Sequence, residues 1–169
     1  MGSIDPMGLW SAGAHHYIYQ NAFPNIDPAL LADINSGSDW VDYLDQFNFG
    51  SYMHAMRAPG QSISDAKKKA CDFINENMNY FKTFKDPYKF KDLAYQALGK
   101  ALHTITDSTS PAHEGWQVWD LYSDEWQWHG DNAAPLETIK QLTPARLSKS
   151  VDLINQALQG STCGCTADQ

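Results

Sequence analysis

One segment of the chain places two imidazoles and a carboxylate at a spacing that suits a metal ion. It is the H-x3-D-x5-H pattern formed by His103, Asp107 and His113. The first two are four residues apart, so their side chains project from one face if the segment is helical. Pro111 is expected to end that helix, and His113 then enters from the turn. Neutral imidazole and carboxylate bind Zn²⁺ well and can leave a position open for water, so the segment favours a zinc hydrolase.

The elements that must position this segment are predicted to be helices. Apolar residues recur at helical spacing in three long stretches, 64–81, 87–108 and 144–158, and Ser64 is the expected cap of the first. Shorter helices are predicted at 15–22, 28–34, 38–46 and 135–141, whereas 50–59 and 114–131 are typical of loops or of broken helix. No alternating pattern indicates a strand. We therefore expect an all-α fold, a compact domain of several helices.

Two interpretations are open for the helix face that carries His103 and Asp107. Helical arithmetic places the pair opposite the apolar stripe around Leu98. The face is then either a solvated polar surface or the wall of a metal cleft, in which Gly99 leaves room one turn below His103. We favour the cleft because His113 continues the ligand pattern.

The composition limits the class of protein. The chain has 169 residues, of which 43% are hydrophobic and 12% aromatic, so one globular domain with a real core is expected. The net charge of −8 disfavours broad binding to a nucleic-acid backbone, although a small metal-assisted nuclease site remains compatible with it. We recognise no apolar run of about 18 residues and no signal peptide, so we expect neither a membrane-spanning helix nor a leader in this chain.

The three cysteines do not indicate a disulfide framework. Cys163 and Cys165 fall in a polar tail, residues 161–169. We expect a disordered terminus there rather than a metal site, because a lone pair of thiols lacks the second half of a ligand set.

The chain resembles the zinc-dependent phospholipase C family of bacteria, which shares its all-helical fold with the fungal single-strand-specific nucleases. The pattern Leu-His-x3-Asp-x3-Pro-x-His at 102–113 is the family's pattern, and weaker similarity covers most of residues 10–141. The resemblance implies a helical fold of the phospholipase C type and a site for two or three Zn²⁺ ions.

The resemblance implies four ligands for the first zinc: Asp42, His54, His103 and Asp107. Asp42 stands in a segment, Gly37-x4-Asp42-Tyr43, similar to the one that supplies the family's early aspartate. It would ligate zinc and orient or deprotonate the attacking water, while Asp107 would bridge two ions. Tyr43 matches a position that faces the choline cation in the family, where an aromatic ring is suited to a cation. The family's N-terminal acidic partner of choline has no match here.

The second zinc would be held by His113 and His129. The family also places a carboxylate four residues after its last histidine, but that position is Ala133 in this chain. Asp131 and Glu137 are the nearest substitutes. Glu137 has a second interpretation, as an acid in the first turn of a helix.

The N-terminus carries a second resemblance. Ile4-Asp5-Pro6-Met7-Gly8-Leu9 resembles the D-P-x-G-L signature that closes the shell of Rhs/YD-repeat proteins, although a chance Asp-Pro turn is the alternative. Those proteins carry variable toxin domains, which are released by self-cleavage after the leucine. We expect residues 1–9 to be a vector-derived start followed by the end of the shell motif, 10–160 the toxin domain, and 161–169 the tail.

The third zinc connects the two resemblances. The phospholipase C family begins its mature chain with a tryptophan whose free amine and carbonyl ligate this ion, and cleavage after Leu9 would make Trp10 that residue. His15 would be the other ligand, with Asp107 as the bridge. His16 is the alternative if the register is off by one, although we expect it to be a surface neighbour.

The expected reaction is hydrolysis of a phosphodiester, because clustered Zn²⁺ acidifies a bound water and neutralises phosphate oxygens. We expect membrane phospholipid as substrate, with a single-strand-specific nuclease as the alternative and a non-catalytic, zinc-stabilised binding module as a third hypothesis. As a toxin, the domain would be delivered into a target cell by its parent Rhs protein, and its producer would need an immunity protein. Tryptophans in the segment 114–131 would touch lipid chains, stack on bases or pack in the core.

Overall fold

The computed structural model describes residues 11–44, 48–86, 88–119, 139–160 and 163. These residues form α-helices and short 3-10 helices, with no strand among them, so the all-α prediction is confirmed. The α-helices are α1 (Ala12–Ala22), α2 (Pro28–Leu44), α3 (Ile63–Phe84), α4 (Lys91–Asp107) and α6 (Pro144–Gln159). The 3-10 helices are η1 (Asn48–His54), η2 (Tyr88–Phe90) and η5 (Ile139–Gln141). None of the helices described is long and apolar enough to cross a membrane.

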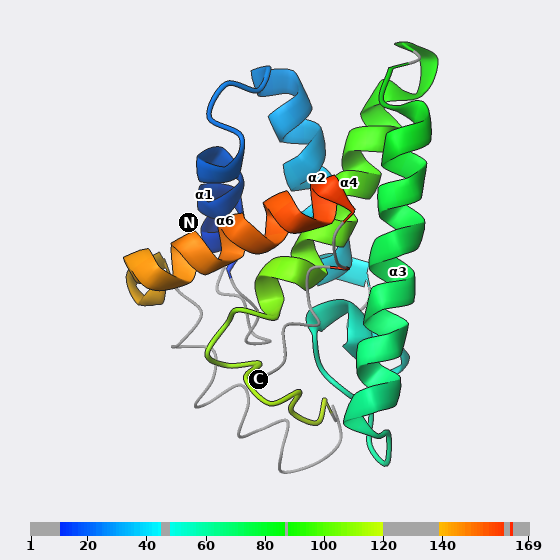
Figure 1. Ribbon diagram of the computed structural model, residues 1–169, viewed down its shortest axis with the longest axis vertical. Coiled ribbons are helices and arrows are strands. Elements are labelled where there is room, and N and C mark those ends of the chain that lie inside the picture. Colours follow the sequence, from blue (N-terminus) through cyan, green and yellow to red (C-terminus); the bar gives the residue numbers. More distant parts are fainter. Residues whose placement is uncertain (1–10, 45–47, 87, 120–138, 161–162, 164–169) are drawn as a thin grey trace.

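Helix α4 lies at the centre of the fold. It packs along α2 and α3, which are its most extensive contacts, and α6 crosses over α1 and α4 (Figure 1). Leu98, Leu102 and Ile105 belong to the core together with Ile18 of α1 and Ile74 of α3. Because other elements cover α4 on several sides, its polar residues near the C-terminal end are buried along with its apolar ones.

Two glycines allow α2 and α4 to approach backbone to backbone. A Cβ atom on Gly37 would lie 2.0 Å from the carbonyl oxygen of Gln96, and one on Gly99 would lie 1.9 Å from that of Ile34. The space beside Gly99 is therefore filled by α2, so the idea that this glycine opens a cleft was wrong. The same contact explains why the predicted helices 28–34 and 38–46 form one helix, because Gly37 is held in the helix interior by packing.

The other helix boundaries moved by a few residues. Ser62 caps α3, since its hydroxyl accepts a hydrogen bond from the backbone N–H of Asp65 at 3.1 Å, so the expected cap at Ser64 was wrong. The helix predicted from residue 87 begins as the separate turn η2, and α1 starts three residues earlier than expected. The segment 50–59, expected to be loop or broken helix, begins with the end of the short helix η1. The helix predicted at 135–141 is described only as η5.

A disulfide joins Cys71 of α3 to Cys163, which follows α6. The sequence had not indicated this pairing, and Cys163 is accordingly fixed and buried rather than part of a disordered tail. The cross-link ties the segment that follows α6 to α3. The rest of the tail, apart from this residue, lies outside the part of the chain that the structure describes.

Candidate metal centre

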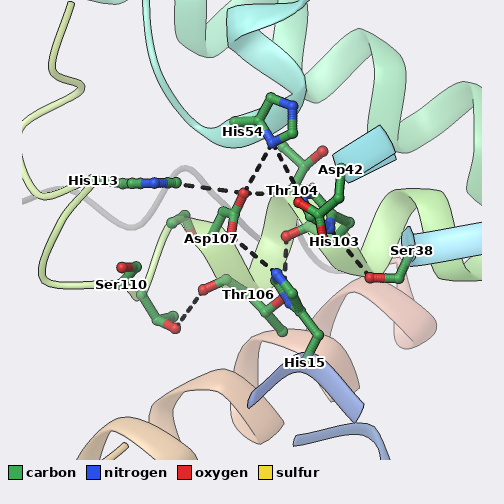
Figure 2. Close-up of polar contacts among 12 residues, drawn as sticks. His15, Ser38, Asp42, His54, His103, Thr104, Thr106, Asp107, Ser110 and His113 are labelled. Carbon is green, nitrogen blue, oxygen red and sulfur yellow. Dashed lines mark hydrogen bonds and ion pairs between the residues drawn. The ribbon is translucent and has the colours of Figure 1, made fainter. Parts of the chain in front are cut away.

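The last turn of α4 places Asp107 among four imidazoles. Its Oδ2 atom lies 3.0 Å from His103 Nε2, 3.4 Å from His54 Nδ1 and 3.8 Å from His113 Nδ1, and its Oδ1 atom lies 3.3 Å from His15 Nε2 (Figure 2). All five side chains are fully buried. The interpretation of this helix face as a solvated surface was therefore wrong. The face points into a buried cluster of ligand-type groups.

The separations between these atoms fit a metal ion. His54 Nδ1, His103 Nε2 and Asp107 Oδ2 are 3.0, 3.0 and 3.4 Å apart. In a tetrahedral zinc site with bonds of about 2.0–2.1 Å, neighbouring ligand atoms lie about 3.3 Å apart. Both oxygens of Asp107 are buried without a hydrogen-bond partner, which a bound cation would provide. The group could therefore hold a metal ion.

A second group of possible ligands overlaps the first. It consists of His15, Asp42 and His103, whose ligand atoms all lie within 4.8 Å of one another. Asp42 comes from α2, and its Oδ1 atom lies 3.6 Å from His103 Nε2. Its side chain is 20% exposed, so it stands at the boundary between the buried cluster and solvent.

Two of the imidazole rings are hydrogen-bonded to hydroxyl groups through the nitrogen that faces away from the cluster. His15 Nδ1 lies 2.8 Å from Thr106 Oγ1, and His103 Nδ1 lies 3.2 Å from Ser38 Oγ. Ser38 Oγ is in turn hydrogen-bonded to the hydroxyl of Tyr19 at 3.0 Å. Each ring thus has one nitrogen hydrogen-bonded to a hydroxyl and the other directed at the cluster, as is usual for metal-binding histidines.

The third ring, His54, is held by an aromatic neighbour. The indole of Trp119 stacks on it, with ring centroids 5.6 Å apart and planes 15° from parallel. The backbone N–H of Trp119 donates to the carbonyl oxygen of Arg57 at 2.8 Å, and the N–H of Arg57 donates to the carbonyl oxygen of Gln117 at 3.0 Å. The short pairing between Arg57 and Val118 therefore brings the segment after His113 across the ring of His54.

The electrostatics of the cluster favour a neutral ring at His103 and an ionised carboxylate at Asp107. Burial lowers the pKa of His103 to about 3, although the charge of Asp107 acts in the opposite direction. Burial alone would raise the pKa of Asp107, but the imidazoles of His103 and His113 outweigh it and hold the pKa well below its ordinary value. Neutral imidazole and ionised carboxylate are the forms that bind metal.

The structure brings together six of the residues expected from the sequence: His15, Asp42, His54, His103, Asp107 and His113. His16 does not join them, because its Nε2 atom pairs with Asp39 Oδ1 at 2.9 Å and its side chain is 30% exposed. Tyr43 follows Asp42 but is 84% exposed, so it is not part of the buried cluster. The expected ligands Trp10, His129, Asp131 and Glu137 lie outside the described residues.

Sequence reasoning missed the groups that orient the rings. Ser38 precedes Asp42 by four residues, and on α2 both therefore face His103. That spacing could have been noticed, but a helix boundary was expected at Ser38. Thr106 and Trp119 gave no comparable pattern, because their partners lie far away along the chain.

Comparisons with protein-family models, with curated proteins and with solved structures found no match for this chain.

Proposed function

We propose that this chain is a zinc-dependent phosphodiesterase of the phospholipase C type, which acts on membrane phospholipid as the toxin domain of an Rhs-repeat protein. The observation that carries the proposal is the position of Asp107 among His15, His54, His103 and His113, all buried. Burying an ionised carboxylate costs free energy unless an opposite charge compensates it. A cation bound between Asp107 and the imidazoles would provide that charge.

Zinc is the ion that this ligand set favours. Imidazole and carboxylate groups bind Zn²⁺ well. In His15 and His103, the ring nitrogen that faces away from the cluster is hydrogen-bonded to a hydroxyl, which orients the other nitrogen toward it. The two oxygens of Asp107 face different histidines: Oδ1 faces His15, and Oδ2 faces His54 and His103. This division supports a carboxylate shared between two ions, as the resemblance to the phospholipase C family implies.

When bound, zinc would supply Lewis acidity, which acidifies a water ligand and offsets charge on a phosphate. The protein's own groups have separate tasks. His103 stays neutral and so keeps a lone pair for a metal, while Asp107 stays ionised. Asp42, at the exposed edge of the cluster, is placed to orient a water molecule and accept its proton.

Tyr43 supports a phospholipid substrate. Its ring is 84% exposed and directly follows Asp42, so a substrate at the edge of the cluster could reach it. An aromatic face attracts a quaternary ammonium such as that of choline. The same ring could also stack on a base, which keeps a single-strand-specific nuclease as the alternative.

The disulfide supports an extracytoplasmic place of action, because disulfides persist in oxidising compartments. The toxin assignment depends on the motif at residues 4–9, which lies outside the described residues. It implies release after Leu9, a new N-terminus at Trp10 and a cognate immunity protein.

The test uses protein purified without chelator, both as the full chain and as a chain that begins at Trp10. Zinc per chain is measured by elemental analysis, and hydrolysis is measured on phosphatidylcholine vesicles, single-stranded DNA and single-stranded RNA. We expect two or three zinc ions and release of phosphocholine, with the Trp10 form binding more zinc than the full chain.

Cleavage of the nucleic acids alone would replace the phospholipase proposal by the nuclease. Firmly bound zinc without hydrolysis of any substrate would favour the non-catalytic module. One zinc ion or none, still so after zinc addition to the Trp10 form, would overturn the catalytic proposal as a whole.

A further inference from the structure

The hydroxyl group of Thr106 donates its proton to backbone carbonyl groups of its own helix. Its Oγ1 atom lies 2.9 Å from the carbonyl oxygen of Leu102 and 3.0 Å from that of His103. A carbonyl oxygen can only accept a hydrogen bond, so the hydroxyl must be the donor in both contacts. A hydroxyl has a single proton, and its oxygen can therefore only accept from any further partner.

His15 is such a partner. Its Nδ1 atom lies 2.8 Å from Thr106 Oγ1, and both side chains are fully buried. An accepting oxygen at that distance requires a proton on Nδ1. A neutral imidazole has only one N–H, so the Nε2 atom of His15 is then left with a bare lone pair.

That lone pair faces a negative charge. His15 Nε2 lies 3.3 Å from Asp107 Oδ1, and both atoms are buried without a hydrogen-bond partner. Two lone pairs at this distance in a buried site repel each other, and a cation between them converts the repulsion into coordination.

We propose that Thr106 is a positioning residue, which holds His15 in the Nδ1–H tautomer and so directs its bare Nε2 atom, together with Asp107 Oδ1, at a metal ion. The effect on metal binding rests on the proposed zinc centre, whereas the tautomer can be measured in metal-free protein.

The place of Thr106 in the fold suits this task. It stands on α4 between His103 and Asp107, whereas His15 stands on α1, 91 residues away. One turn of α4 thus provides two possible ligands and fixes the ring of a third. The hydrogen bonds from its hydroxyl to the carbonyl oxygens of Leu102 and His103 hold the side chain in one rotamer, so the acceptor oxygen has little freedom to move.

The first measurement is the tautomer of His15 in metal-free protein labelled with ¹⁵N-histidine. Long-range ¹H–¹⁵N correlation spectra above pH 7.5 distinguish a protonated ring nitrogen from a bare one, and the His15→Gln variant identifies the His15 signals. We expect a proton on Nδ1 and none on Nε2. A proton on Nε2 would overturn the proposal without any need for a variant.

The second measurement compares zinc affinities by competition with a chromophoric chelator. Thr106→Val keeps the shape of the side chain and removes the hydroxyl, whereas Thr106→Ser keeps the hydroxyl. We expect the valine variant to bind the most weakly held zinc about 10–100-fold less tightly, as is typical for loss of a partner behind a metal-binding histidine. The serine variant should restore most of the affinity.

Thr104→Val is the matched control. Thr104 is equally buried on α4, but its hydroxyl donates to the backbone carbonyl oxygen of Met53 at 2.6 Å. Its replacement should lower stability while leaving the His15 tautomer and zinc affinity unchanged. Equal losses in Thr106→Val and Thr106→Ser, or wild-type affinity in a folded Thr106→Val, would overturn the positioning role. If the wild-type protein binds no zinc, the proposed function fails, and the tautomer in metal-free protein still decides whether Thr106 orients His15.

Discussion

His54 Nδ1 lies 3.0 Å from His103 Nε2, so two imidazole rings from different elements turn a nitrogen toward the same buried point. One ring comes from η1 and the other from α4, 49 residues later. A hydrogen bond between the two nitrogens requires a proton on one of them and a lone pair on the other. Asp107 Oδ2 lies 3.0 Å from His103 Nε2 and 3.4 Å from His54 Nδ1, which makes this point the natural position for a cation.

Replacing Asp107 by asparagine should remove zinc from the protein. Asp107 faces both proposed ions, and asparagine lacks the charge that balances them. We expect zinc affinity to fall by at least about 100-fold, since even outer-shell partners of metal ligands contribute 10–100-fold. Hydrolysis of phosphatidylcholine should fall with it. Elemental analysis after dialysis measures the effect.

Asp39→Asn is the matched control for this variant, because Asp39 also pairs with a histidine but lies outside the cluster. Its zinc content should equal that of the wild type. Retention of zinc by Asp107→Asn would place the metal elsewhere in the chain.

The metal-free protein should lose stability as the pH falls below about 6.5. In the unfolded chain a histidine takes up a proton near pH 6.5, whereas burial lowers the pKa of His103 in the folded protein to about 3. Between these values the unfolded state binds more protons, so the free energy of unfolding decreases with decreasing pH. Asp107 should destabilise the folded protein further at still lower pH. Its pKa is lower in the folded protein than in the unfolded chain, so its stabilising charge is lost only on strong acidification.

Urea unfolding of chelator-treated protein at pH 7.5, 6.5, 5.5 and 4.5 measures this slope. The free energy of unfolding of His103→Asn should depend less on pH, because this variant lacks the imidazole whose pKa is lowered by burial. A free energy of unfolding that is constant or rises between pH 6.5 and 4.5 would contradict the buried, neutral state of His103.

The contact between α2 and α4 should not tolerate a side chain at Gly99. A Cβ atom there would lie 1.9 Å from the carbonyl oxygen of Ile34, and a backbone atom cannot move aside as a flexible side chain can. We expect Gly99→Ala to lower the free energy of unfolding by about 1–3 kcal/mol or more. Zinc affinity should also fall, because α2 carries Ser38 and Asp42 to His103.

Gly13→Ala provides the comparison within the same fold. Gly13 lies in α1, and its Cβ would meet only a side-chain atom of Ile139 at 3.4 Å and one of Ser11 at 4.0 Å. This variant should be neutral or more stable by up to about 1 kcal/mol, because alanine favours a helix. Equal thermal stability of the two variants would show that the two helices are not in backbone contact.

The sequence was sufficient for features that depend on local periodicity. The i, i+4 spacing of His103 and Asp107 correctly placed both on one face of a helix, and the turn after Pro111 brings His113 to the same carboxylate. The all-α fold followed from apolar residues at helical spacing. The addition of His15, Asp42 and His54 to this cluster depended on the family resemblance, since nothing local to those residues indicates where they meet.

Features that depend on distant backbone contacts could not be predicted. Gly37 resembles a helix breaker in the sequence, but in the fold it is the position where α4 touches α2. Nothing in the sequence around Ser38 or Thr106 indicates a role in orienting a histidine, because each contacts its ring only in the folded protein. The Cys71–Cys163 pair joins positions 92 residues apart, and only the packing of the helices brings them together.

The disulfide should contribute measurably to stability. Closing a loop of 92 residues reduces the conformational entropy of the unfolded chain, and native disulfides of this kind typically stabilise by about 2–4 kcal/mol. Cys163→Ser should therefore shift urea unfolding to lower urea concentration. Hydrogen exchange in α6 should accelerate, because the segment that follows this helix is no longer tied to α3. Cys165→Ser is the control and should unfold like the wild type. Thiol titration of protein made in an oxidising compartment should give one free thiol among the three cysteines, whereas three free thiols would contradict the cross-link.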